Sequence, residues 1–246
     1  MTGCSGIGRI HSLETLGALD GPGIRLVFFL QGCPLRCRYC HNPETWDPAG
    51  GSYRSATDLA FFARRYRPYF AGGGGVTVSG GEPLAQLPFV GELFRILRQD
   101  GISTVLDTSG WLADSRPDPE VLGLLRETDL VLLDIKALTE ERFRWLTGQS
   151  GRPLRRFISL CEQSGCPVRI RQVILPDFND KPDDIEDLAV YLKAWPNLKI
   201  ESIELLGYHR LGLEKWRRLG RSYSLGQTPA MDPQRLQILQ EYADRL

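Results

Sequence analysis

The sequence is organised around residues 31–42, Gln-Gly-Cys-Pro-Leu-Arg-Cys-Arg-Tyr-Cys-His-Asn, which directly follow the apolar run 24–30, Ile-Arg-Leu-Val-Phe-Phe-Leu. Three of the chain's six cysteines, Cys33, Cys37 and Cys40, fall within eight residues here. Cysteine thiolates at such short spacings hold iron–sulfur clusters. Three ligands leave one iron of a four-iron cluster open, as catalytic metal sites leave a position open. The stretch therefore predicts a reactive metal loop at the end of a buried strand.

Spacing alone leaves other interpretations of these cysteines open. His41 directly follows Cys40 and would complete a structural zinc site. A disulfide framework suits this chain poorly, because it is large and its other cysteines, Cys4, Cys161 and Cys166, are scattered. We interpret those three as ordinary free thiols, with Cys4 in the N-terminal tail.

Length and charge exclude several classes of protein. The 246 residues suit one large domain, and we expect a single domain over residues 1–246 whose C-terminal segment, 207–246, packs over one end. Lys plus Arg and Asp plus Glu number 30 each, so no overall basic field would attract nucleic acid. We find no signal segment and no run of eighteen apolar residues. We therefore predict a cytoplasmic protein with neither nucleic-acid nor membrane partners, in a reducing compartment that suits metal-binding thiolates.

Strands and helices alternate along the rest of the chain. Apolar runs predict strands at 24–30, 76–78, 104–107, 130–134, 168–174 and 199–206. Helical patterns lie at 55–65, 89–99, 119–126, 153–164, 183–195 and 233–246, whereas the Gly- and Arg-rich segment before the last helix has no clear pattern. This alternation predicts an α/β fold with a parallel sheet, because parallel neighbours need crossover connections. Periodicity does not decide whether the sheet curls into a barrel.

Unusual residues follow several of these strands. They are Gly80, Gly81 and Glu82 after the second, Asp107, Thr108 and Ser109 at the third, Asp134 and Lys136 at the fourth, and His209 after the sixth. In a parallel sheet these residues would line one rim, where α/β enzymes assemble their sites. The glycines would let a ligand approach the backbone, and Glu82 would accept hydrogen bonds from an amino group. Both features suit a zwitterionic cofactor.

Together, these motifs resemble the radical S-adenosylmethionine superfamily and, within it, the family of pyruvate formate-lyase activating enzymes. The cysteine motif and the Gly-Gly-Glu-Pro strand end carry the likeness to the superfamily. The family landmarks lie at residues 8–12, 20–25, 39–42, 107–108, 134–136 and 208–212. They extend over nearly the whole chain and are specific as a set, whereas the cysteine motif alone would identify only the superfamily.

The resemblance implies a partial (β/α)6 barrel that resembles a TIM barrel and holds one [4Fe–4S] cluster through Cys33, Cys37 and Cys40. S-adenosylmethionine would chelate the fourth iron. An electron from the reduced cluster would cleave the sulfonium, and the resulting deoxyadenosyl radical would remove a hydrogen atom from a glycine of pyruvate formate-lyase. The partner would then carry a glycyl radical. Flavodoxin or a similar carrier would supply the electron.

The resemblance also implies roles for other residues. Those that would contact S-adenosylmethionine are Tyr39, Cys40, His41, Gly81, Asp134, Ile135, Lys136 and His209. Asp20 would help to hold the glycine loop of the partner. Asp107, Thr108, Asp134 and the Leu132 carbonyl match a monovalent-cation site, for which oxygen ligands are suited.

Two departures from the family pattern affect these expectations. Residues 41–75 contain no cysteine, so we expect no second cluster. Gly207 stands where the family usually has proline, which bears on the placement of His209. Three alternatives stay open: activation of another glycyl-radical enzyme, radical chemistry on a small molecule, and a zinc-binding interaction module.

Overall fold

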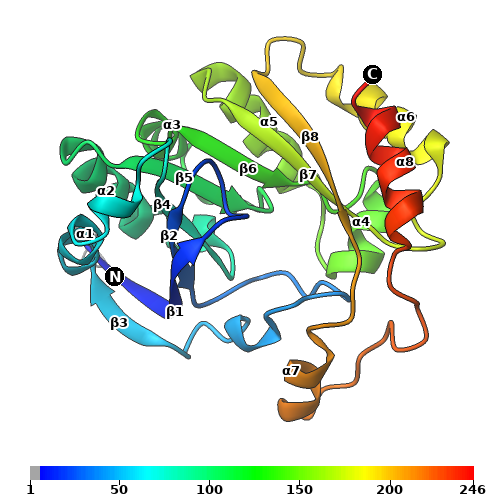
Figure 1. Ribbon diagram of the computed structural model, residues 1–246, viewed down its shortest axis with the longest axis horizontal. Coiled ribbons are helices and arrows are strands. Elements are labelled where there is room, and N and C mark those ends of the chain that lie inside the picture. Colours follow the sequence, from blue (N-terminus) through cyan, green and yellow to red (C-terminus); the bar gives the residue numbers. More distant parts are fainter. Residues whose placement is uncertain (1–5) are drawn as a thin grey trace.

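The computed structural model describes residues 6–246, so the prediction for Cys4 lies outside the described residues. Within this range one sheet has the strand order β3-β1-β2-β4-β5-β6-β7-β8 (Figure 1). The strands are β1 (Ile7–Gly17), β2 (Arg25–Leu30), β3 (Ser52–Ser55), β4 (Gly75–Gly80), β5 (Ser103–Thr108), β6 (Leu130–Asp134), β7 (Val168–Ile174) and β8 (Ile200–Gly207). Because β3 and β8 are edge strands that do not pair with each other, the sheet does not close. It is a curved, open barrel (Figure 1).

The six predicted strands form the parallel part of this sheet. β2, β4, β5, β6, β7 and β8 pair in parallel with their neighbours in this order. Their carboxyl ends therefore meet along one rim, as the strand-end residues predict. The α/β partial barrel is confirmed.

Two antiparallel strands extend the sheet beyond β2, and the sequence pattern does not reveal them. β1 pairs with both β2 and β3. Its apolar side chains do not mark a buried face, since Leu13 and Leu16 are exposed, and β3 lies at the edge with little buried surface. Strands of this kind lack the alternation that hydrophobic pattern detects.

Helices flank the outer side of the sheet, except for α7, which lies away from the sheet (Figure 1). They are α1 (Ala56–Arg64), α2 (Leu87–Gln99), α3 (Asp118–Arg126), α4 (Glu140–Thr147), α5 (Arg152–Ser164), α6 (Pro182–Leu192), α7 (Leu213–Arg218) and α8 (Pro233–Ala243). The prediction locates six of them to within about three residues at each end and misses α4 and α7. None of the helices in residues 6–246 has both the length and the apolar character needed to cross a membrane.

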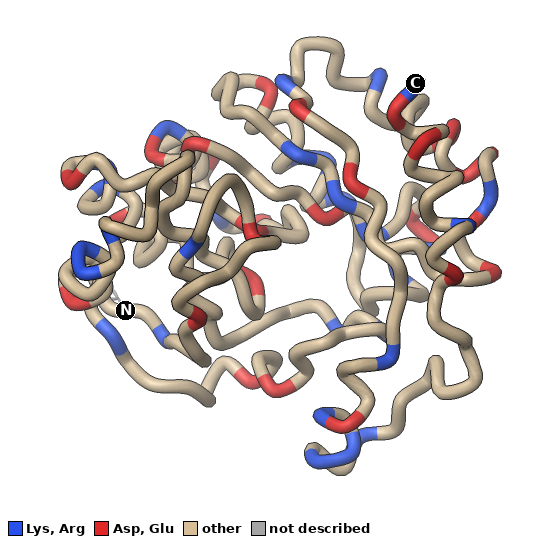
Figure 2. The backbone as a smooth tube through the Cα atoms, in the orientation of Figure 1, with Lys and Arg blue, Asp and Glu red and all other residues tan. Residues whose placement is uncertain are grey.

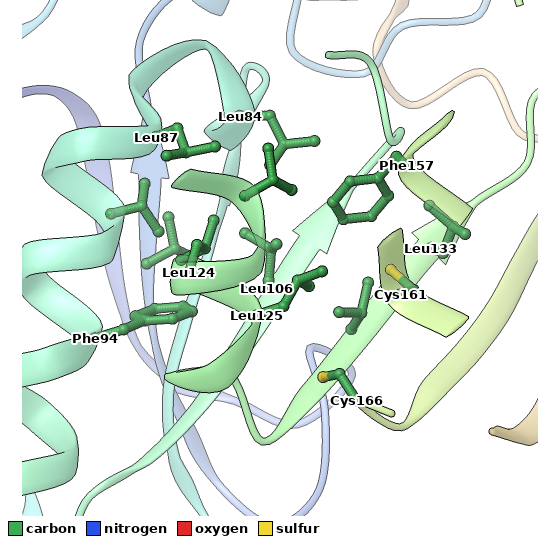
Figure 3. Packing of buried hydrophobic residues seen from close by; sticks show 14 of the residues in the cluster. Leu84, Leu87, Phe94, Leu106, Leu124, Leu125, Leu133, Phe157, Cys161 and Cys166 are labelled. Carbon is green, nitrogen blue, oxygen red and sulfur yellow. The ribbon is translucent and has the colours of Figure 1, made fainter. Parts of the chain in front are cut away.

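The main hydrophobic core lies between the sheet and the outer helices (Figure 3). Phe94 from α2, Leu124 from α3 and Phe157 from α5 pack there against strand residues such as Leu106. Figure 3 also shows Cys161 and Cys166 within this core. Both are buried free thiols, which fits their interpretation as small apolar residues.

Arg25 is a fully buried cation at the amino end of β2, opposite the rim. Its guanidinium donates to the Val76 carbonyl at 2.6 Å, to Thr77 Oγ1 at 3.0 Å and to the carbonyls of Gly73 and Ser103 at 3.1 Å. Burial lowers its pKa to about 10, so it stays charged at neutral pH. The glycine run at 72–75 is thus tied into the end of the barrel rather than serving as a linker.

Candidate active site

The cysteine loop leaves the carboxyl end of β2 and is shaped by backbone hydrogen bonds. The Gly32 N–H donates to the Thr45 carbonyl at 2.7 Å, and the Cys40 N–H donates to the Cys37 carbonyl at 3.0 Å. Gly32 has a φ of 95°, which a residue with a side chain rarely adopts. The chain can therefore turn sharply from strand into loop.

Helix α4 supports one side of this loop. The Arg36 N–H donates to the Thr147 carbonyl at 2.8 Å, and the Arg38 N–H donates to the Leu146 carbonyl at 2.9 Å. These carbonyls belong to the last turn of α4, where helical carbonyls lack partners within the helix. The loop thus satisfies the end of α4 while α4 fixes the loop.

The segment around α7 supports the other side. The Trp216 indole N–H donates to the Cys40 carbonyl at 2.8 Å. Lys215 contacts Glu44 Oε1 at 2.6 Å and Asn42 Oδ1 at 2.7 Å. The Trp216 ring also meets Trp46 edge to face, with ring centroids 5.0 Å apart. The Gly- and Arg-rich segment that contains α7, which has no clear hydrophobic pattern, therefore holds the cysteine loop in place.

The strand end at Gly80 and Gly81 packs directly against the loop. The Gly81 N–H donates to the Leu30 carbonyl at 2.8 Å, and the Glu82 N–H donates to the Gly32 carbonyl at 2.9 Å. A Cβ atom on Gly81 would lie only 2.2 Å from the Gly32 oxygen. Glycine is therefore required here by the approach of two chain segments, a reason that the sequence did not reveal.

A cavity of about 570 Å³ opens at the rim, within the usual size range of small-molecule sites. It collects most of the residues that the sequence singles out. Its lining includes Cys33, Cys37, Tyr39, Cys40, His41, Gly80, Gly81, Asp107, Thr108, Ser109, Asp134, Lys136 and His209. The full lining draws residues from the five parallel strands β4 to β8, from the cysteine loop and from the C-terminal segment, which thus meet at one site.

Four predicted residues do not line this cavity. Asp20 lies in the β1–β2 turn, where burial raises the pKa of its carboxyl and the nearby Asp107 carboxylate raises it further. Leu132 is buried on β6, where it pairs in register with Asp107. Ile135 is buried, and its N–H donates to the Arg171 carbonyl at 2.8 Å. The fourth residue is Glu82.

The Glu82 carboxylate is fully engaged by protein donors. One oxygen accepts from the Leu84 N–H at 3.0 Å and from the Thr108 hydroxyl, and the other accepts from both the N–H and the hydroxyl of Ser109. Glu82 is only 1% exposed, and burial raises its pKa. The structure therefore places Glu82 behind the rim, where it orients Thr108 and Ser109, rather than in reach of a cofactor amino group.

Burial and one cation control the charge of the thiols. Burial raises the pKa of Cys33, and it raises that of Cys37 to about 12 although the Lys136 ammonium lowers it. Burial alone would lower the pKa of Lys136, but its ion pair with Asp134 raises it. Free thiols are thus protonated at neutral pH, and cluster binding must displace their protons.

Two buried polar atoms test whether the cavity suits a bound cofactor. The Tyr39 hydroxyl and Asp134 Oδ1 are buried and have no hydrogen-bond partner. Buried polar atoms nearly always have partners, so both atoms are positioned to bind a ligand group. Three thiols and this pair of polar atoms in one cavity fit an iron–sulfur cluster beside a polar cofactor.

His41 is held by the C-terminal segment. Its ring stacks on His209 with centroids 4.0 Å apart, and its Nε2 lies 3.3 Å from the His209 carbonyl oxygen. Burial and the nearby His209 lower the pKa of His41, so its ring is neutral at neutral pH. This placement brings the two predicted histidines together despite Gly207, and it does not favour His41 as the fourth zinc ligand.

Several residues that shape the site were not predicted. Trp46 and Trp216 enclose the cysteine loop, and Ser79 donates to Asp107 Oδ2 at 2.6 Å. Ser79 is the second-last residue of β4 and directly precedes the glycine pair, so its position near a strand end could have indicated a site residue. No local pattern pairs the two tryptophans, which are 170 residues apart.

Comparison with known proteins identifies the family. The radical SAM superfamily model matches residues 27–191. The pyruvate formate-lyase-activating enzyme of Clostridium pasteurianum is 42% identical over 241 residues, which cover 98% of each chain. The enzyme of that name from Staphylococcus aureus is 40% identical, with 96% of this chain and 95% of the relative covered.

Solved structures support the fold. A domain of pyruvate-formate lyase-activating enzyme from Bacteroides vulgatus aligns with a TM-score of 0.56 and 22% identity over 70% of this chain and 94% of that chain. Streptococcus suis SuiB, bound to its precursor peptide, aligns with a TM-score of 0.64 and 18% identity over 89% of this chain and 44% of that chain. The chain belongs to the radical SAM superfamily and, within it, to the family of pyruvate formate-lyase-activating enzymes.

Proposed function

We propose that this protein activates pyruvate formate-lyase by installing a glycyl radical on it. The observation that carries the proposal is the three-thiol loop opening into a cavity that also holds unpartnered polar atoms. The family uses a [4Fe–4S] cluster and S-adenosylmethionine. When bound, these groups supply a carbon-centred radical that takes a hydrogen atom from the partner's glycine.

The residues of the chain then have distinct roles. Cys33, Cys37 and Cys40 hold the cluster as thiolates. Tyr39 and Asp134 offer their free oxygens to the polar end of S-adenosylmethionine. The other predicted contacts line the same cavity, except for Ile135 and Glu82. This enclosure limits the access of water to a reactive radical.

Two further assignments extend the site. Asp107, Thr108 and Asp134 present oxygens beside the cavity, and with the Leu132 carbonyl they would hold a monovalent cation. Asp20, at the turn beside Asp107, would meet the partner's glycine loop. A flavodoxin or similar carrier in the cytoplasm would supply electrons to the cluster.

The proposal is tested with cluster-loaded protein under anaerobic conditions. Incubation with S-adenosylmethionine, dithionite and pyruvate formate-lyase should give the doublet of a glycyl radical in electron paramagnetic resonance. A full cluster without this signal would contradict the assignment. The same assay with other glycyl-radical enzymes tests the first alternative.

The small-molecule alternative needs its own measurement. A short peptide that spans the glycine loop of the partner should bind and should promote cleavage of S-adenosylmethionine. A peptide that does neither would favour a small-molecule substrate. Membership of the radical SAM superfamily removes the reason to retain the zinc-binding module.

A further inference from the structure

Three arginines on or over the cysteine loop have no acidic partner. These are Arg36, Arg38 and Arg221, which we call the basic rim. Arg36 donates to the Cys33 and Leu35 carbonyls, and Arg38 donates to the Trp145 carbonyl at 2.8 Å. Arg36 and Arg221 are exposed, and no ion pair involves any of the three within residues 6–246. Their charge is therefore available to a binding partner.

The α7 segment increases this local charge. Residues 210–221 include five basic residues and one acidic residue, Glu214. Arg217 and Arg218 share Glu214, at 3.8 and 3.3 Å. Figure 2 shows these basic residues gathered at the end of the molecule where α7 lies. The chain as a whole has no net charge, so this concentration is a local feature.

Trp46 connects the basic rim to the cluster loop. The guanidinium carbons of Arg36 and Arg221 lie 5.1 and 5.2 Å from its ring centroid. The Trp46 carbonyl accepts from the Cys33 N–H at 3.4 Å, and its ring meets Trp216, whose indole N–H donates to the Cys40 carbonyl at 2.8 Å. One buried aromatic side chain thus separates two surface cations from a cluster ligand.

We propose that the basic rim is the docking surface for an acidic one-electron carrier protein. The inference rests on the proposed function, in which the cluster is reduced from outside. One electron leaves the carrier, which is oxidised by one electron, and the cluster is reduced by one electron; no bond is made or broken. Docking on this surface places the donor over the short path through Trp46.

Charge complementarity argues for this occupant. Electron-transfer partners form small interfaces and dissociate readily, and charges at an interface rim mainly set the rate of encounter. A surface of unpaired arginines over a buried path to the cluster provides this steering. Nucleic acid is a poorer candidate, because a protein without net charge lacks the wide basic field that it requires.

Charge reversal at Arg221 provides the test. Its side chain is exposed, stacks on the Trp46 ring and makes no hydrogen bond or ion pair within residues 6–246, so Arg221→Glu should leave the fold intact. The matched control is Arg126→Glu, which makes the same charge change on the exposed end of α3. Arg221→Lys keeps the charge and should bind like the unchanged protein.

Binding of oxidised flavodoxin to the anaerobic cluster-loaded protein is measured by calorimetry at 50 and 200 mM salt. Arg221→Glu should weaken binding about fivefold or more at low salt, since one exposed charge pair is worth about 1 kcal/mol, and the loss should shrink at high salt. Arg126→Glu should bind normally. Equal effects of the two reversals, or no effect of either, would overturn the docking surface.

Reduction by dithionite separates this inference from the proposed function. Dithionite needs no docking surface. After reduction by dithionite, the cluster of the Arg221→Glu variant should therefore show the same paramagnetic signal as that of the unchanged protein, and the variant should still yield a glycyl radical. If dithionite yields no glycyl radical even in the unchanged protein, the proposed function fails. If Arg221→Glu weakens binding of pyruvate formate-lyase but not of flavodoxin, the basic rim serves the protein substrate and the inference is wrong.

Discussion

Replacing Glu82 by glutamine should lower the stability of the fold rather than act directly on cofactor binding. The carboxylate accepts four hydrogen bonds, two at each oxygen, and two of the donors are the backbone N–H groups of Leu84 and Ser109. A glutamine amide keeps one oxygen and places an NH2 group at the other position. The hydroxyls of Thr108 and Ser109 can turn to accept from this group, but a backbone N–H cannot.

Whichever way the amide is oriented, one buried backbone N–H loses its acceptor, which costs about 1–3 kcal/mol. The remaining bonds weaken by about 1 kcal/mol each, because their acceptor is no longer charged. Relief of the buried charge offsets part of this loss, since burial raises the pKa of Glu82. The net loss should be about 2 kcal/mol, or a fall of about 4–8 °C in Tm.

Urea denaturation of the reduced, cluster-free protein measures this change apart from cofactor binding. Glu92→Gln is the matched control, because Glu92 forms only an exposed pair with Arg95 at 2.8 Å and should change stability by less than about 0.5 kcal/mol. If Glu82→Gln unfolds like the control but loses affinity for S-adenosylmethionine, Glu82 contacts the cofactor, and its role behind the rim is refuted.

Three further predictions concern the loop and the β1–β2 turn. Cys37→Ala should abolish glycyl-radical formation and lower cluster iron after anaerobic reconstitution; full activity would mean that the cluster is misplaced. Trp216→Phe keeps an aromatic ring but is smaller than the indole and lacks its bond to the Cys40 carbonyl, so it should lower the free energy of unfolding in urea by about 1 kcal/mol or more and speed cluster loss to a chelator. The raised pKa of Asp20 contributes stability that is present below the ordinary value near 4 and is lost as pH rises through the folded value. Asp20→Asn should therefore flatten the decline in unfolding free energy above about pH 4, and an unchanged slope would contradict this.

The parallel sheet was predictable because its strands carry one of two clear hydrophobic patterns. Residues 130–134 form a continuous apolar run that is buried, and residues 168–174 alternate between buried and half-buried positions, so both strands were located without error. β1 was missed because its exposed leucines do not mark a buried face. The shared position of Asp107, Asp134 and Lys136 at one rim also followed from topology, since parallel strands bring their carboxyl ends together.

The contacts of Glu82 could not be predicted in the same way. A carboxylate at a strand end reads as a ligand-binding group, and only the fold shows that Thr108 and Ser109 on the neighbouring strand occupy it. The glycine pair is similar, because a side chain on Gly80 would meet the Leu30 backbone and one on Gly81 would meet the Gly32 backbone. Sequence pattern gives the edge at which a residue lies but not which protein groups already bind it.

The two helices absent from the prediction are those that hold the cysteine loop. α4 is rich in charge and contributes only a few buried residues, and α7 has six residues with one buried tryptophan, so neither has a strong apolar face. Their contacts with the loop are made largely by backbone carbonyls and one indole N–H, and such contacts produce no hydrophobic periodicity in the sequence. Because protein hydrogen bonds shape the loop, the thiols need less ordering on cluster binding than in a domain that folds only around its metal. The three cysteines specify the ligands, and segments more than a hundred residues away specify their arrangement.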